Sequence, residues 1–163
     1  MISSLTLCVV IAILLFAALY DIKHRRIPNI LPLLIVALYC IYAVFGCFLD
    51  SAHDVDLLDG LMVGSLLLAF GLILFAVGAA GGGDVKLLAA ISLFAGTPYI
   101  APLLILTALS GGLVASVIWI GSKMHPKQNK VDGANRHGVP YGVAITVSGI
   151  WLCIQLIKVG GFA

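Results

Sequence analysis

The chain alternates between long apolar runs and short polar segments. The apolar runs cover residues 2–20, 30–49, 57–80, 85–96, 99–121 and 139–158. A helix needs about 20 consecutive apolar residues to cross a bilayer, and most of these runs approach that length. The pattern therefore predicts an all-α fold: one polytopic transmembrane bundle of about six helices, with residues 1–163 forming a single domain.

The fourth and fifth runs are separated only by a short break, Gly96-Thr97-Pro98. Because proline interrupts the hydrogen bonds of a helix interior, Pro98 and Pro102 could instead kink one long helix. Within the third run, Gly64, Ser65 and Gly71 could let two helices pack closely, which is a common use of small residues in membranes.

Composition supports a membrane protein. Hydrophobic residues make up 62% of the chain and charged residues only 10%, against roughly 25% charged residues in an ordinary soluble domain. The net charge of +2 does not indicate nucleic-acid binding, because the basic residues lie in loops between apolar runs rather than on one face. We therefore expect membrane lipids, and no nucleic acid, among the partners.

The positions of the charges predict the orientation. Basic residues lie in the first polar segment, near the start of the fourth run and in the last polar segment: Lys23, Arg25, Arg26, Lys86, Lys123, Lys127, Lys130 and Arg136. The second polar segment is acidic, with Asp50, Asp54 and Asp56. By the positive-inside rule the N-terminus lies outside the cell membrane, and both Asp21 and Asp84 lie at the cytoplasmic side.

Asp21 and Asp84 are the strongest candidates for chemistry among seven acidic residues, all of them aspartates. A carboxylate at membrane depth is costly, so it indicates function and requires a partner. Asp21 ends the first run, where the helix dipole disfavours negative charge. Two aspartates in one pocket share a proton, so that one activates a water molecule and the other donates to a peptide carbonyl. This arrangement predicts an aspartic protease.

Three consecutive glycines, Gly81, Gly82 and Gly83, precede Asp84. Having no Cβ atom, they would let an extended substrate backbone lie close to the carboxylate, and we interpret them as part of a substrate site. Lys86 could pair with a carboxylate or a substrate terminus, or its side chain could reach up to the membrane surface.

Simpler interpretations remain open for the same residues. Asp84 could cap a helix after a glycine turn, and Asp21 could be a surface charge beside the membrane. A proton- or cation-coupled transporter could use the same two aspartates, and a structural membrane subunit would need no chemistry. Asp59 and Asp132, like the acids of the second polar segment, are expected in solvated loops. The histidines are scattered, so we expect no metal and no cofactor.

Three stretches together resemble the type IV prepilin peptidases, a family of aspartic membrane proteases with a G-x-G-D motif. They are DIKHRRIPN at 21–29, GGGDVKLL at 81–88 and VPYGVAI at 139–145. Their order and spacing are similar to the family pattern along nearly the whole chain. A glycine stands at position 82, where alanine is common in the family.

The resemblance implies an endopeptidase that cleaves the basic leader from a prepilin or pseudopilin, whose apolar helix lies in the bilayer. Asp21 and Asp84 match the two catalytic aspartates. The chain lacks the cytoplasmic cysteine-containing segment of the members that also N-methylate, so it is similar to the short Tad/Cpa-type form that serves Flp-like pilins. The sequence identifies neither the particular pilin nor the oligomeric state.

Overall fold

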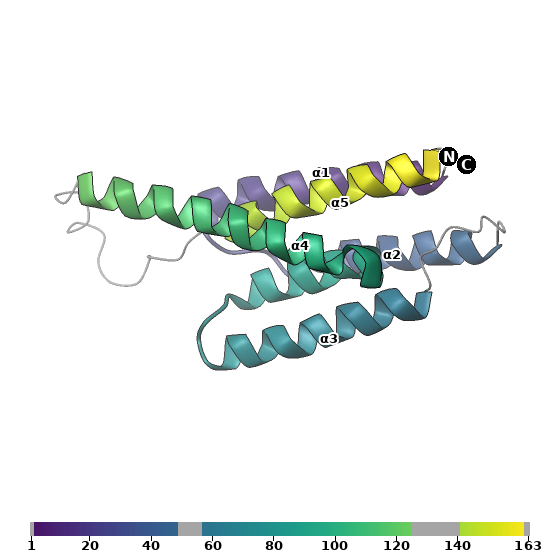
Figure 1. Ribbon diagram of the computed structural model, residues 1–163, viewed down its shortest axis with the longest axis horizontal. Coiled ribbons are helices and arrows are strands. Elements are labelled where there is room, and N and C mark those ends of the chain that lie inside the picture. The colour runs from purple at the N-terminus through teal and green to yellow at the C-terminus, as the bar shows by residue number, and fades with distance from the viewer. Residues whose placement is uncertain (1, 49–56, 125–140, 162–163) are drawn as a thin grey trace.

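The computed structural model describes residues 2–48, 57–124 and 141–161, and these residues form five helices. Figure 1 shows them as a bundle along the long axis of the molecule. The helices are α1 (Ile2–His24), α2 (Ile30–Phe48), α3 (Leu57–Ala76), α4 (Gly82–Met124) and α5 (Tyr141–Gly161). The acidic segment 49–56 and most of the last basic segment lie outside the described residues.

The helices are long and apolar enough for a multi-pass membrane protein. Within the described part of the chain, four candidate spans meet the length and hydropathy of a membrane crossing, and Ile30–Val44 of α2 is a shorter apolar stretch. Helix α4 is central, because it packs against α2, α3 and α5, while α1 packs against α5 and α2. The all-helical bundle of the described residues agrees with the predicted fold class.

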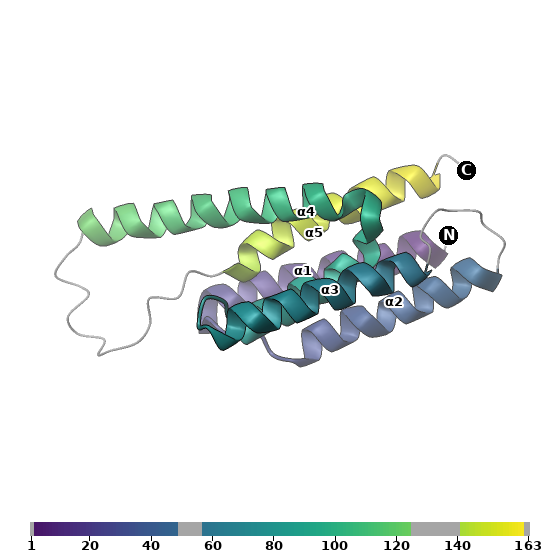
Figure 2. The same ribbon diagram turned by 60° about the horizontal axis from the view of Figure 1, so that its bottom comes forward.

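The predicted fourth and fifth runs form one helix, α4, so residues 2–48, 57–124 and 141–161 form five helices where about six were expected for the chain. The helix changes direction at Gly96, whose backbone angles are φ 53° and ψ −170°. Figure 2 shows the part of α4 after this kink running back along the molecule. The alternative of one kinked helix was therefore correct, although a glycine makes the kink and Pro98 and Pro102 follow it.

Asp59 holds the kink from the first turn of α3. Its carboxylate accepts a hydrogen bond from the Thr97 backbone N–H at 2.6 Å and another from the Thr97 hydroxyl. The kink frees that N–H from the helix ladder, so Asp59 caps the second half of α4 from a neighbouring helix. The prediction that Asp59 lies in a solvated loop was therefore wrong.

Glycines bring α3 against the first half of α4. A Cβ atom at Gly64 would lie 2.5 Å from Leu93 Cδ2, and one at Gly71 would collide with Val85 Cγ1. Both glycines are buried, which confirms the expectation that small residues allow close helix packing here. This contact fixes the first half of α4, and with it Asp84, relative to the bundle.

Helices α1 and α5 lie side by side, with α5 running against the direction of α1 (Figure 1). The Thr146 hydroxyl of α5 donates to the Leu14 carbonyl of α1 at 2.9 Å. Close packing at Gly149 strengthens the same contact, because a Cβ atom there would lie 2.7 Å from Leu14 Cδ1. These contacts set the register that brings the start of α5 to the end of α1.

Replacement of the kink glycine tests this architecture. Gly96→Ala is expected to lower the free energy of unfolding by about 1–3 kcal/mol, the cost of a side chain in a backbone region that only glycine adopts freely. The added Cβ atom would also lie 2.6 Å from Asp59 Oδ2. The measurement is reversible unfolding in mixed detergent micelles. Gly112→Ala is the control, because no atom lies within 4 Å of its added Cβ; equal stability of the two variants would contradict the assigned role.

Candidate active site

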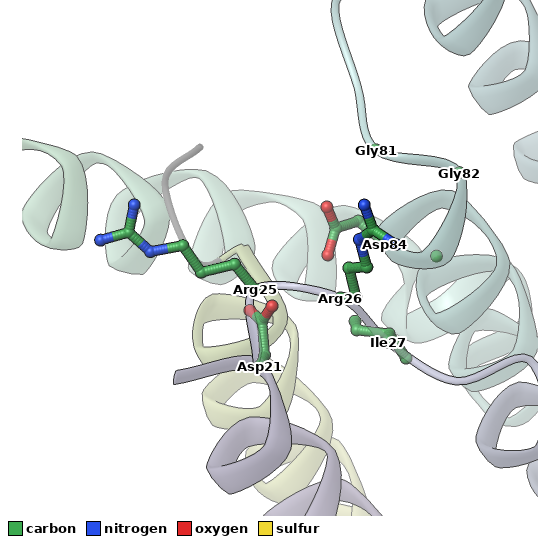
Figure 3. A pocket seen from close by; sticks show the side chains of 8 residues that line it. Asp21, Arg25, Arg26, Ile27, Gly81, Gly82 and Asp84 are labelled. Atoms are coloured by element: carbon green, nitrogen blue, oxygen red, sulfur yellow. The ribbon is translucent and has the colours of Figure 1, made fainter. Parts of the chain in front are cut away.

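The end of α1 and the start of α4 enclose one pocket, with a cavity volume of about 250 Å³. Figure 3 shows the carboxyl groups of Asp21 and Asp84 turned toward the same space from two different helices. The lining residues are Asp21, Arg25, Arg26, Ile27, Gly81, Gly82, Gly83 and Asp84. The structure therefore brings together both predicted aspartates and all three predicted glycines.

Asp21 is buried within α1 rather than ending it. The helix continues to His24, so the predicted boundary at residue 20 was too early. Only 4% of Asp21 is exposed, and its Oδ2 accepts a hydrogen bond from the Gly142 backbone N–H at 2.9 Å. Gly142 lies in the first turn of α5, where N–H groups have no partner within their own helix. Asp21 is thus an internal hydrogen-bonded carboxylate, not a surface charge beside the membrane.

Gly142 must be a glycine for this contact to form. A Cβ atom at this position would lie 2.7 Å from Asp21 Oδ2 and 3.0 Å from its Cγ. Any side chain would push the carboxyl group away from the amide. The glycine therefore permits the close approach of α5 to Asp21.

Arg25 ends α1 in a left-handed conformation. Its φ is 50°, and its N–H donates to the Asp21 carbonyl at 2.7 Å, which closes the last turn of the helix. A left-handed residue other than glycine costs about 1–2 kcal/mol. The turn directs residues 25–29 along the pocket, where Arg25, Arg26 and Ile27 line it.

Asp84 lies in the first turn of α4, half-buried. Helix α4 begins at Gly82, so Gly82 and Gly83 are helical, and the prediction that α4 begins only at residue 85 was wrong. The Gly81 carbonyl accepts the Val85 N–H at 3.0 Å, which places Gly81 at the capping position. Asp84 therefore is not the capping residue of this helix.

Each glycine of the run makes room for a different neighbour. A Cβ atom at Gly81 would lie 2.5 Å from Asp84 Oδ2, and one at Gly82 would lie 3.2 Å from the Phe75 ring. At Gly83 it would lie 3.0 Å from Ile27 Cβ and 3.2 Å from the Ile27 carbonyl oxygen. Contacts with backbone atoms inside the protein thus require a glycine at Gly83, whereas Gly81 and Gly82 face side chains that can rotate; the approach of the glycines to a substrate stays a prediction.

Lys86 ties the two sides of the pocket together. Its Nζ donates a hydrogen bond to Asn29 Oδ1 at 3.0 Å, and both side chains are exposed. The bond joins the start of α4 to the segment that follows α1. Lys86 thus pairs with neither carboxylate in the structure, and a role toward substrate stays a prediction.

Sequence reasoning assigned no role to Gly142 or to Asn29. Gly142 lies inside the third family stretch, 139–145, so the motif pointed to the right segment without showing that its contribution is a backbone N–H. Among the residues that the structure describes, no group of three or more His, Cys, Asp or Glu side chains could hold a metal ion.

Comparison with known proteins identifies the family. The model of the type IV leader peptidase family matches residues 8–116, more than half of the 163-residue chain. The chain belongs to this family of proteases. The match covers both Asp21 and Asp84, together with the whole glycine run. No curated protein and no solved structure matches the chain.

A large side chain at Gly83 should open the pocket. The nearest atoms to its added Cβ include the Ile27 backbone, which cannot move away by rotating a side chain. In a cysteine-free background, Ile27→Cys is therefore expected to react several-fold faster with a thiol reagent when Gly83→Leu is also present. Gly112→Leu provides the matched control, because the space around Gly112 is open. Equal labelling rates in both backgrounds would show that Gly83 does not hold residues 25–29 in place.

Proposed function

We propose that the protein is an aspartic endopeptidase that removes the basic leader from type IV prepilins, of the Flp-like class, at the cytoplasmic face of the cell membrane. The observation that carries the proposal is that Asp21 and Asp84, 63 positions apart in the chain, line one pocket. Membership of the leader peptidase family supports the reaction class and a prepilin substrate.

The two carboxyl groups supply a complete acid–base pair for hydrolysis. The ionised member removes a proton from water, whose oxygen bonds to the scissile carbonyl carbon while the protonated member gives its proton to the carbonyl oxygen. A neutral diol forms, and the two aspartates have exchanged protonation states. Transfer of the newly acquired proton to the amide nitrogen then breaks the C–N bond, and a diol proton returns to the other carboxylate. The products are an acid and an amine, and the dyad is restored.

The position of the pocket suits a substrate that is itself membrane-embedded. The pocket lies where α1 ends and α4 begins, and the kink at Gly96 lies at the far end of the first half of α4 (Figure 2). Positively charged Arg25 and Arg26 line the same end of the bundle, which the positive-inside rule assigns to the cytoplasm. A leader that has remained on the cytoplasmic side could reach this end directly.

The transporter alternative makes a different use of the same residues. It requires the carboxylates to bind or relay a cation across the bundle, whereas the leader peptidase family performs peptide hydrolysis. The two functions are separated by the fate of a prepilin, because a transporter would leave its processing unchanged by substitution of either aspartate.

Single substitutions test the dyad. Asp21→Asn and Asp84→Asn are each expected to lower the rate of leader cleavage by about 10²–10⁴-fold or more, since each removes one half of the acid–base pair. Cleavage of a co-expressed Flp-like prepilin is followed by gel shift, and membrane insertion of each variant is checked by immunoblot. Ser116→Ala is the control, because Ser116 is exposed on the second half of α4, bonds only to the Gly112 carbonyl of its own helix and does not line the pocket. Normal processing by either dyad variant would overturn the proposal.

The dyad also predicts a bell-shaped dependence of kcat/KM on pH. At low pH both carboxyl groups are protonated and no base remains, while at high pH both are ionised and no acid remains. The profile is measured with purified enzyme in nanodiscs, with circular dichroism at each pH to show that the enzyme stays folded. A flat profile across the acid range, with intact enzyme, would exclude chemistry by a shared proton.

A further inference from the structure

We infer that the backbone N–H of Gly142 divides the roles of the two aspartates, so that Asp21 is the ionised base and Asp84 carries the shared proton. This inference rests on the proposed protease function and names a positioning group for it. The group lies at the start of α5, in a part of the chain that lies beyond the residues matched by the family model.

The hydrogen bond to Asp21 favours its charged form. An N–H that donates to a carboxylate makes a charge-assisted bond, which is stronger than a bond between neutral groups. The Gly142 N–H lies 2.9 Å from Asp21 Oδ2 and is buried with it, so water competes little for the bond. The first turn of α5 also carries the positive end of its helix dipole, which offsets the negative end of the α1 dipole beside Asp21.

Asp84 lacks an equivalent donor within the part of the chain that the structure describes. Its own helix dipole also favours charge, since it lies in the first turn of α4. However, no N–H or O–H of a described residue donates a hydrogen bond to the Asp84 carboxylate. Gly81 lies close to Asp84 Oδ2 but has no side chain that could donate one. When two nearby carboxyl groups hold one proton, the proton stays on the group whose charge is less well stabilised. That group is Asp84.

The charged groups around the pocket do not reverse this assignment. Arg25 and Arg26 line the pocket together with both aspartates, and the charge of Arg25 favours the ionised form of Asp21, so it acts in the same direction as the Gly142 bond. Lys86 follows Asp84 on α4, but its Nζ bonds to Asn29. Within the described residues of α5, the only charged side chain is Lys158, in the last turn, far along the helix from Gly142. The Gly142 bond is therefore the feature that distinguishes the two carboxyl groups.

The assignment orders the proton transfers. Asp21 takes the proton from the attacking water, and the proton on Asp84 passes to the carbonyl oxygen as the C–O bond becomes single. Asp21 then gives its new proton to the leaving nitrogen while Asp84 recovers one from the diol. The Gly142 N–H moves no proton; it holds Asp21 in the ionised form from which each cycle starts.

Exchange of glycine 142 for glycolic acid tests the inference without adding a side chain. The resulting ester lacks the N–H but has the same size as the peptide bond, so the clash that a Cβ atom would make with Asp21 is avoided. The enzyme is made by cell-free translation into nanodiscs and assayed on a synthetic prepilin peptide. We expect the acidic limb of the pH profile of kcat/KM to move to higher pH and the rate on that limb to fall about tenfold or more, as for loss of a bond to a charged group. The alkaline limb should not move to lower pH.

The same exchange at Gly149 is the control. Gly149 lies in α5 but packs against Leu14 and Ile91, away from the pocket, so its ester weakens the helix without affecting Asp21 directly. The inference would be overturned by an ester at 142 that leaves the acidic limb unchanged or shifts it no more than the ester at 149 does. In that case, inactivity of the Asp21→Asn and Asp84→Asn variants would still support the protease proposal. Active Asn variants would instead overturn the protease proposal itself.

A second measurement needs no ester and keeps the inference testable if that variant fails to fold. The acidic side chains are seven aspartates, so ¹³Cγ-labelled aspartate gives few carboxyl signals. The signals of Asp21 and Asp84 are identified by their loss in the Asn variants. In a pH titration of the wild-type protein, Asp21 should keep the chemical shift of a carboxylate to lower pH than Asp84, which should be the first of the two to show the shift of a carboxylic acid. The reverse pattern would overturn the assignment.

Discussion

A buried carboxylate in an apolar bundle is the constraint on which this structure depends. Asp21 is 4% exposed, and a charge at such a position is costly unless a hydrogen-bond donor compensates for lost water. The C-terminal end of α1 cannot supply that donor, because its free groups are carbonyls and its dipole is negative. The opposite end of another helix can, and α5 brings the Gly142 N–H to Asp21. The hydrogen bond to Asp21 therefore requires that α1 and α5 pack in one particular register.

The kinked central helix α4 places the second carboxyl group, that of Asp84, beside Asp21. Its first half must begin beside Asp21, yet its second half must pack against α5, and no straight helix of 43 residues could do both. Gly96 solves this by reversing the direction of the helix, and Asp59 caps the N–H that the reversal leaves free. The kink at one end of the bundle thus allows the two aspartates to meet at the other.

The apolar pattern predicted most of the fold, because the period and length of membrane helices depend on local composition. It placed α1, α2, α3 and α5 to within a few residues at most of their ends. The errors occur at helix ends: residues 21–24 extend α1, Gly82 and Gly83 join α4, and Asp59 caps the second half of α4. For Asp59 the partner, Thr97, lies 38 positions away, which a reading of neighbouring residues cannot include.

The sequence predicted the main residues of the candidate site but not the contacts that hold them in place. Asp21, Asp84 and the three glycines were found from the sequence, and all of them line one pocket. The structural reason for Gly83 was not found, because it is the Ile27 backbone, on a segment 56 positions earlier, that leaves no space for a side chain there. The partner of Asp21 was not found either. It is a backbone N–H, which every residue but proline carries, so side-chain identities cannot reveal it.

The Gly142 N–H is also a feature by which the surroundings of the two aspartates differ. By sequence each is an acid at the edge of an apolar run, and nothing local separates a base from an acid. The difference comes from a third segment, 121 positions after Asp21, whose contribution leaves one trace in the sequence: a glycine where a Cβ atom would lie 2.7 Å from the carboxylate. In the proposed dyad, two chemically identical side chains thus differ through the packing of the helix that covers one of them. The chemistry that we propose for the pocket depends on the α1–α5 contact as much as on the residues that line it.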